Sequence, residues 1–148
     1  MASIQKPNER YTLGAMIDPD ALGVATHDAA LYMDVRLHRE FMAVFQIGAM
    51  VATSTVDCSV VQATSSSGTG VKAVTGLAAT QLLAAGGDNR NIIINFDGSD
   101  IDDAGGFFWV SPRIVVGTAG SDGSAALFGV TPVHGPATDN ASVVEIIN

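Results

Sequence analysis

Charge is scarce in this sequence: Asp, Glu, Lys and Arg together make up 15% of the 148 residues. An ordinary soluble domain carries about 25%. A single chain of this size usually covers itself with more charge, so we expect other subunits to cover much of its surface. The length and the 47% of apolar residues fit one domain with a sizeable core.

Basic residues are scarcer than acidic ones, seven against fifteen, which gives a net charge of −8. No basic stripe that would bind a phosphate backbone is present, so we expect no nucleic-acid binding. Four of the seven basic residues lie within the first 39 positions, and acids dominate from Asp88 onward. A basic N-terminal part and an acidic remainder would let oppositely charged surfaces of neighbouring subunits pair. For any single charge, exposure to solvent is the simpler explanation.

The single cysteine excludes an internal disulfide. Cys58 lies at an apolar alternating position, which predicts a buried, inert thiol in a chain compatible with a reducing cytoplasm. The first ten residues lack the apolar core of a signal peptide. The longest apolar run, Phe41–Ala52, falls short of the ~18–20 residues of a membrane helix. We therefore predict neither export nor membrane insertion.

Catalytic motifs are also missing. His27, His38 and His134 are far apart, and none has the spacing of a metal ligand. Ser65–Ser67 lacks a G-x-S-x-G elbow, and Gly68–Lys72 lacks the spacing of a phosphate-binding loop. The sequence predicts no enzyme activity and no cofactor.

An acidic segment offers one weak metal candidate. Asp97, Asp100 and Asp102 lie close together, and Ca²⁺ prefers six to eight oxygen ligands. No Glu follows at the closing position of a calcium loop. A solvated acidic loop is the alternative that we favour.

Alternating apolar and polar residues indicate short strands, and no run of ten or more residues holds a helical period. Strands are expected at Leu31–His38, Phe41–Val51, Val56–Thr64, Val71–Leu83, Asn91–Phe96, Phe107–Thr118, Ser124–Val133 and Ser142–Ile147, with a short helical turn over Thr80–Ala85 as an equal alternative to the end of the fourth. These strands and their small-residue turns predict an all-β fold, an antiparallel β-sandwich or jelly-roll-like domain over residues 29–148. Phe41–Val51, apolar on both faces, suits a central strand, and Pro112 places its strand at an edge or a bulge.

Residues 1–28 differ, because prolines and glycines interrupt them too often for a long helix or strand. Their apolar residues are nevertheless costly to leave in water. We expect an extended N-terminal arm that becomes ordered on a partner rather than on its own sandwich. Its predicted contact residues are Tyr11, Leu13, Met16, Ile17 and Leu22.

Two later segments carry a family resemblance, QATSSSGTGVKAVTG from Gln62 and NIIINFDGSDIDDAGGFFWVSPRIVVGTAG from Asn91. Both resemble small virion structural proteins of tailed bacteriophages, in which a strand ending in Gln-Ala-Thr meets a Gly-rich turn and a K-x-(I/V)-T-G segment. The resemblance runs from Leu31 to the C-terminus and leaves the first 28 residues without a counterpart. It implies a non-enzymatic head decoration or cement protein, made in the host cytoplasm, that binds the major capsid protein at the capsid surface.

Such proteins commonly occupy three-fold positions, so the resemblance also implies a homo-oligomer, with a trimer as our prediction. Phe107 and Trp109 are the predicted contact, because they are aromatics on a chain short of charge. A tail or head–tail connector component is one alternative. Another is a carbohydrate-binding sandwich, in which Trp109, Phe107 and Tyr32 form a platform and the acidic loop holds Ca²⁺.

Overall fold

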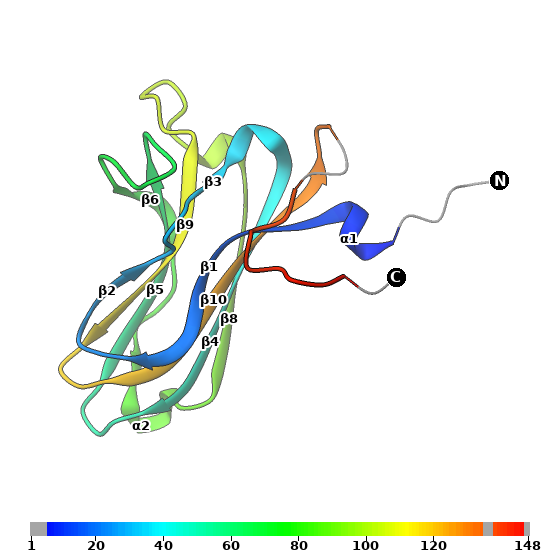
Figure 1. Cartoon of the computed structure of the whole chain (residues 1–148). Helices are drawn as coiled ribbons and strands as arrows, with labels where there is room; N and C mark the ends of the chain where they lie inside the picture. The colour runs from blue at the N-terminus through cyan, green and yellow to red at the C-terminus, as the bar shows by residue number, and fades with distance from the viewer. Residues whose placement is uncertain (1–5, 135–137, 147–148) are drawn as a thin grey trace.

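The computed structural model describes residues 6–134 and 138–146, which fold as two antiparallel sheets packed face to face (Figure 1). The four-stranded sheet has the order β1-β10-β4-β8, and the six-stranded sheet has the order β2-β9-β5-β6, with β3 beside β9 and β7 beside β5. The strands are β1 (Tyr11–Leu22), β2 (Ala25–Asp28), β3 (Met33–Asp34), β4 (His38–Met50), β5 (Thr55–Ala63), β6 (Lys72–Ala78), β7 (Leu82–Leu83), β8 (Arg90–Asp97), β9 (Trp109–Gly117) and β10 (Ser121–Pro132). The predicted all-β sandwich is confirmed.

In residues 6–134 and 138–146, helical structure is limited to short turns at the ends of strands. These turns are α1 (Pro7–Arg10), η1 (Val35–Leu37), α2 (Ala84–Gly87) and η2 (Gly98–Asp100). Among the described residues, no helix is long and apolar enough to cross a membrane.

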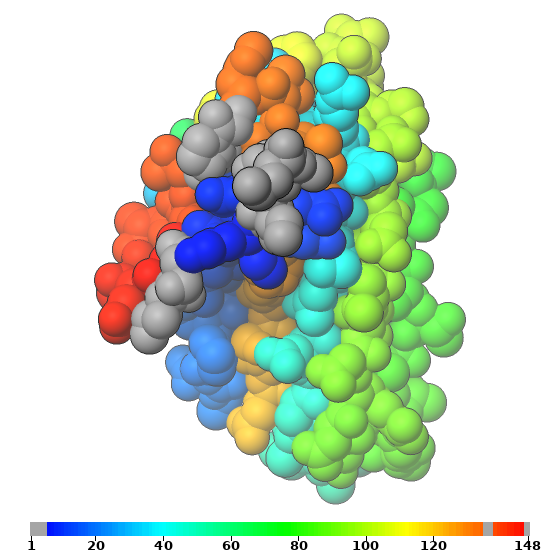
Figure 2. Space-filling view, turned by 90° about the vertical axis from the view of Figure 1, so that its right-hand side faces the viewer, coloured from blue at the N-terminus to red at the C-terminus, as the bar shows by residue number. Residues whose placement is uncertain are grey.

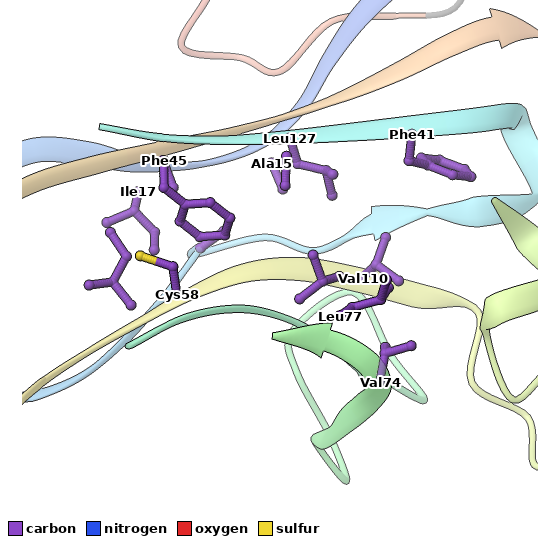
Figure 3. Packing of buried hydrophobic residues seen from close by; sticks show 14 of the residues in the cluster. Ala15, Ile17, Phe41, Phe45, Cys58, Val74, Leu77, Val110 and Leu127 are labelled. Atoms are coloured by element: carbon purple, nitrogen blue, oxygen red, sulfur yellow. The ribbon is translucent and has the colours of Figure 1, made fainter. Parts of the chain in front are cut away.

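The core lies between the two sheets and follows from the period-two alternation of the strands. Phe41 and Phe45 point inward from β4, where they meet Cys58 of β5 and Val110 of β9 (Figure 3). Leu127 of β10 is fully buried beside them. The strand predicted over Phe41–Val51 is confirmed as β4, a central strand between β10 and β8.

The prediction that residues 1–28 lie outside the sandwich is wrong for residues 11–28. β1 pairs along its length with β10, and β2 pairs with β9. The register of β1 shifts at Gly14 and again between Ile17 and Asp20, so its breakers mark bulges in an edge strand, where glycine and proline are tolerated. A Cβ at Gly14 would collide with the side chain of Met33.

The position of Pro112 also differs from the prediction, because β9 is an inner strand between β2 and β5. Its neighbour on one side is interrupted there. β2 ends opposite Arg113, and β3 begins opposite Val110. Neither β2 nor β3 pairs with Pro112, so no ladder hydrogen bond from its backbone nitrogen is needed on that side. A proline therefore fits inside this sheet.

Two predicted strands are wrong in the described residues. The segment predicted as a strand over Leu31–His38 forms only the two-residue β3 before η1 begins. Asp34 accepts a hydrogen bond from the Arg36 backbone N–H and so caps this turn. Residues 142–146 form no strand, and residue 147 lies outside the described residues.

Candidate interaction surface

Metal-ligating side chains do not cluster in the described residues. No three His, Cys, Asp or Glu side chains gather there in a way that would hold a metal ion. Cys58 is 1% exposed, and its burial, together with the charge of Asp57, raises the thiol pKa to about 12. A thiol with so high a pKa is a poor nucleophile.

The acidic loop uses its carboxylates to fix its own backbone. Asp97 Oδ1 accepts from the Ser99 backbone N–H at 2.7 Å, and Asp100 Oδ2 accepts from the Asp97 N–H at 3.0 Å. The Ser99 hydrogen bonds lower the pKa of Asp97. Asp102 pairs with Lys72 and accepts from the Gly105 N–H at 2.9 Å. The carboxylates of the weak calcium candidate, Asp97, Asp100 and Asp102, therefore cap their own loop, and in the described residues no three His, Cys, Asp or Glu side chains form a group that could hold a metal ion.

Phe107 and Trp109 are half-buried by their own chain. Lys72 Nζ lies 4.0 Å from the centroid of the Phe107 ring, and Phe107 packs against the main core. Trp109 packs on a second, smaller cluster, which lies on the outward side of the six-stranded sheet. This second cluster consists of Tyr32, Val61 and Ala63, with Val71 and Trp109 at its border.

The carbohydrate alternative required an exposed aromatic platform made by the same residues. Tyr32 is only 6% exposed, and its hydroxyl donates to Asp28. Its ring lies against Gly68, whose φ of +80° suits a residue without a Cβ. The structure thus buries Tyr32 beside the loop of Ser65–Gly70 and packs Trp109 against the cluster of Tyr32, Val61 and Ala63, so Tyr32 is not presented as part of a platform.

A different apolar surface covers the outward face of the four-stranded sheet, here called the β4 face. Its rows follow the strand register: Met16 is opposite Ala126, which is opposite Val44, which is opposite Ile93. The residues of the β4 face are Tyr11, Leu13, Met16, Met42, Val44, Ile93, Ala126, Phe128 and Val130. All of them are half-buried or exposed. Figure 2 shows β1, β10, β4 and β8 side by side across this face.

Acidic residues border the β4 face at both ends. A depression of about 540 Å³ at one end is lined in part by Glu40, Asp97 and Asp100. Another of about 530 Å³ at the opposite end is lined in part by Asp20 and Asp122. All charged residues that line these two depressions are acidic. A partner surface with an apolar centre and basic edges would be complementary.

The described C-terminal segment follows the free edge of β1 (Figure 1). The Leu13 N–H donates to Asp139 Oδ1 at 2.8 Å, and the Asn140 N–H donates to the Leu13 carbonyl at 2.6 Å. Asn140 Nδ2 also donates to the carbonyl of Gly14. This segment covers the edge of β1 at the bulge, and its Ser142 hydroxyl lies 2.8 Å from the sulfur of Met16, at the β1 side of the β4 face.

The predicted arm contacts divide between two environments. Ile17 and Leu22 are each 7% exposed within the core, so they cannot contact a partner. Tyr11, Leu13 and Met16 lie on the β4 face. Their role in contacting a partner stays a prediction.

Sequence reasoning missed the rest of the β4 face, notably Met42, Val44 and Phe128. The sequence pattern that could have indicated this face is that Phe41–Val51 is apolar on both sides. We interpreted that pattern only as the mark of a central strand, although an outward apolar row also indicates a contact surface.

No protein-family model matches the chain, and no curated protein matches it by sequence. Three structures with a similar chain course come from viruses. The chain is 12% identical to one in the structure of infectious bursal disease virus Gt strain, with a TM-score of 0.42, and the match covers 85% of this chain and 35% of that one. For Broad Bean Stain Virus the identity is 12% and the TM-score 0.38, with coverage of 95% and 100%.

The infectious bursal disease virus Gx strain gives 12% identity and a TM-score of 0.35, with coverage of 84% of this chain and 33% of that one. This chain thus spans about a third of the length of the two infectious bursal disease virus chains. At TM-scores this low, these likenesses carry no argument about function. The β4 face is the feature from which a function can be argued.

Proposed function

We propose that this chain is a non-enzymatic structural protein of a virus particle, and more specifically a decoration or cement protein that binds the major capsid protein. The observation that carries the proposal is the β4 face, with Met42, Val44 and Phe128 at its centre. Monomeric proteins rarely expose a contiguous apolar patch larger than a few hundred Å² unless it contacts something.

Two further features support an assembly role. Charged residues make up only 15% of the chain, which fits a surface partly covered in its working state. In the described residues, His, Cys, Asp and Glu side chains form no group that would hold a metal, and the thiol of Cys58 is buried. The resemblance of the Gln62–Gly76 segment to phage virion proteins suggests which assembly to look for.

The acidic borders of the β4 face define the partner's chemistry. Glu40 and Asp97 lie at one end and Asp122 at the other, so the partner would present an apolar centre flanked by Lys or Arg. Apolar contact supplies most of the affinity in this proposal, and the charges set its orientation.

Electron microscopy of purified particles tests the proposal. Density for this chain on the shell, in hundreds of copies per particle, is the expected result. About six or twelve copies at one vertex would instead support a connector or tail component. Particles that lack the chain altogether would overturn the proposal.

A further inference from the structure

Strand β8 has a free edge in the described part of the chain. It lies at the end of the four-stranded sheet and forms its ladder only with β4, over eight register pairs from Arg90 to Asp97. An edge strand leaves one row of backbone N–H and C=O groups without a sheet partner. Such a row is a template for pairing with another strand.

β8 also lacks the features by which edge strands usually avoid pairing with a strand of another chain. Natural edge strands are commonly short or carry lysine, proline or a bulge. β8 is eight residues long, its register with β4 has no shift, and it reads RNIIINFD. No charge or proline lies between Arg90 and Asp97, and Ile93 at the centre is 58% exposed.

We infer that β8 pairs antiparallel with β8 of a second copy of this chain, across a two-fold axis at Ile93. The charged ends of the strand favour antiparallel pairing. With the axis at Ile93, Arg90 of each copy lies opposite Phe96 of the other and Asp97 opposite Asn89, whereas in-register parallel pairing would place Arg90 beside Arg90 and Asp97 beside Asp97. The hydrogen bonds from Ser99 keep Asp97 ionised by lowering its pKa.

A two-fold axis at Ile93 also matches the side chains across the new ladder. On the outward face, Asn91 would lie opposite Asn95 of the second copy, and Ile93 opposite Ile93. On the inward face, Ile92 would lie opposite Ile94. Each pair joins residues of the same type, and the alternation of facing directions is preserved, because paired residues in an antiparallel ladder share a face.

The pairing would join the two four-stranded sheets into one continuous sheet of eight strands. The β4 faces of both copies would then lie side by side, since Val44 and Ile93 are neighbours in one row. A C₂ contact of this kind uses the same surface on both copies and closes on itself as a dimer, whereas the trimer predicted from the family resemblance would need a different contact. This inference does not depend on the proposed function.

Light scattering coupled to size exclusion over a dilution series of the full chain tests it. We expect the wild type to have twice the 15.2 kDa mass of one chain at high concentration. Ile93→Lys should halve that mass, because a lysine at the centre of an edge blocks pairing. Leu31→Lys is the matched control, since Leu31 is also 58% exposed but lies outside this sheet, and it should leave the dimer intact.

Two cysteine variants keep the test decisive if Ile93→Lys fails to fold. Oxidised Ile93→Cys should give a disulfide-linked dimer, whereas Val51→Cys, at an equally exposed position, should not; Cys58 is too buried to interfere. A monomeric wild type, a dimer that survives Ile93→Lys, or an Ile93→Cys protein that gives no more disulfide-linked dimer than Val51→Cys, would overturn the inference.

Discussion

Arg113 of β9 holds Asp28 of β2 through both carboxylate oxygens. Its Nε donates to Oδ1 at 2.7 Å and its Nη2 to Oδ2 at 2.6 Å. The two residues are directly opposite in the register, and the Tyr32 hydroxyl donates to the same carboxylate at 3.0 Å. Burial, and then the charge of Asp28, raises the pKa of Tyr32 to about 12. This network fastens the short edge strand β2 to the six-stranded sheet.

Asp28→Asn should destabilise the sandwich by about 1.5–3 kcal/mol, the usual contribution of hydrogen bonds to a charged group. The variant keeps the size of the side chain but loses the bidentate ion pair with Arg113. Chemical denaturation followed by circular dichroism measures the difference. Arg36→Gln is the control, because its pair with Asp34 is exposed and should matter much less. Equal effects of the two substitutions would contradict this account of β2.

Removal of residues 1–24 should abolish cooperative folding. That deletion takes away β1, which pairs along β10 and places Ala15, Ile17 and Leu22 in the core. Full burial of a side chain such as Ile17 or Leu22 contributes about 1.5–3 kcal/mol, and the β1 ladder is lost with them.

Removal of residues 1–10 is the matched control, because it ends before β1 begins and should leave the sandwich folded. Thermal unfolding of both proteins, followed by near-UV circular dichroism, distinguishes them. A cooperative transition in the chain that lacks residues 1–24 would show that β1 is dispensable.

His38 should make the protein less stable in mild acid. Its ring is 4% exposed and packs edge-on against Phe41, and neither ring nitrogen has a hydrogen-bond partner in the described residues. Burial lowers its pKa below the ordinary value near 6.5. The unfolded chain therefore binds a proton first as the pH falls, so this contribution to stability is present above about pH 6.5 and is lost below it.

His38→Phe should remove that pH dependence and raise the free energy of unfolding by about 1–3 kcal/mol, because the unsatisfied ring nitrogens disappear. His134→Phe, at an exposed position, should change neither quantity. Denaturation midpoints at a series of pH values between 5 and 8 would measure the effect. An unchanged pH profile in His38→Phe would contradict the assignment to His38.

Local alternation was enough to predict most of the later strands. β5 and β8 follow from their own residues, since Val56, Cys58 and Val60 are buried, whereas Asp57 and Ser59 lie on the opposite face. β1 was missed because Gly14 and Pro19 break the alternation where the strand bulges. Only the pairing with β10, about a hundred residues away in the chain, makes this segment a strand.

The contact surface was harder to predict than the fold. Sequence alternation shows that a strand is apolar on both sides, but it does not show whether its second side is covered by the chain itself. Trp109 is covered in part by the cluster of Tyr32, Val61 and Ala63, which contacts distant in sequence bring together. For Val44 no described segment lies over the row that it forms with Ala126 and Ile93. From the sequence, Phe107 and Trp109 were therefore predicted to be exposed, and the row that contains Val44 was predicted to be buried.

The central claim is that the β4 face contacts the partner. The amount of each of two matched variants on assembled particles tests this claim most directly. Val44 and Val115 are half-buried valines on the outward sides of central strands of the two sheets. Particles assembled with Val44→Lys should lose this chain from the shell, whereas those assembled with Val115→Lys should retain it at the wild-type level, provided that both variants fold. Normal occupancy by Val44→Lys, or equal loss in both variants, would contradict the assignment of the β4 face as the contact surface.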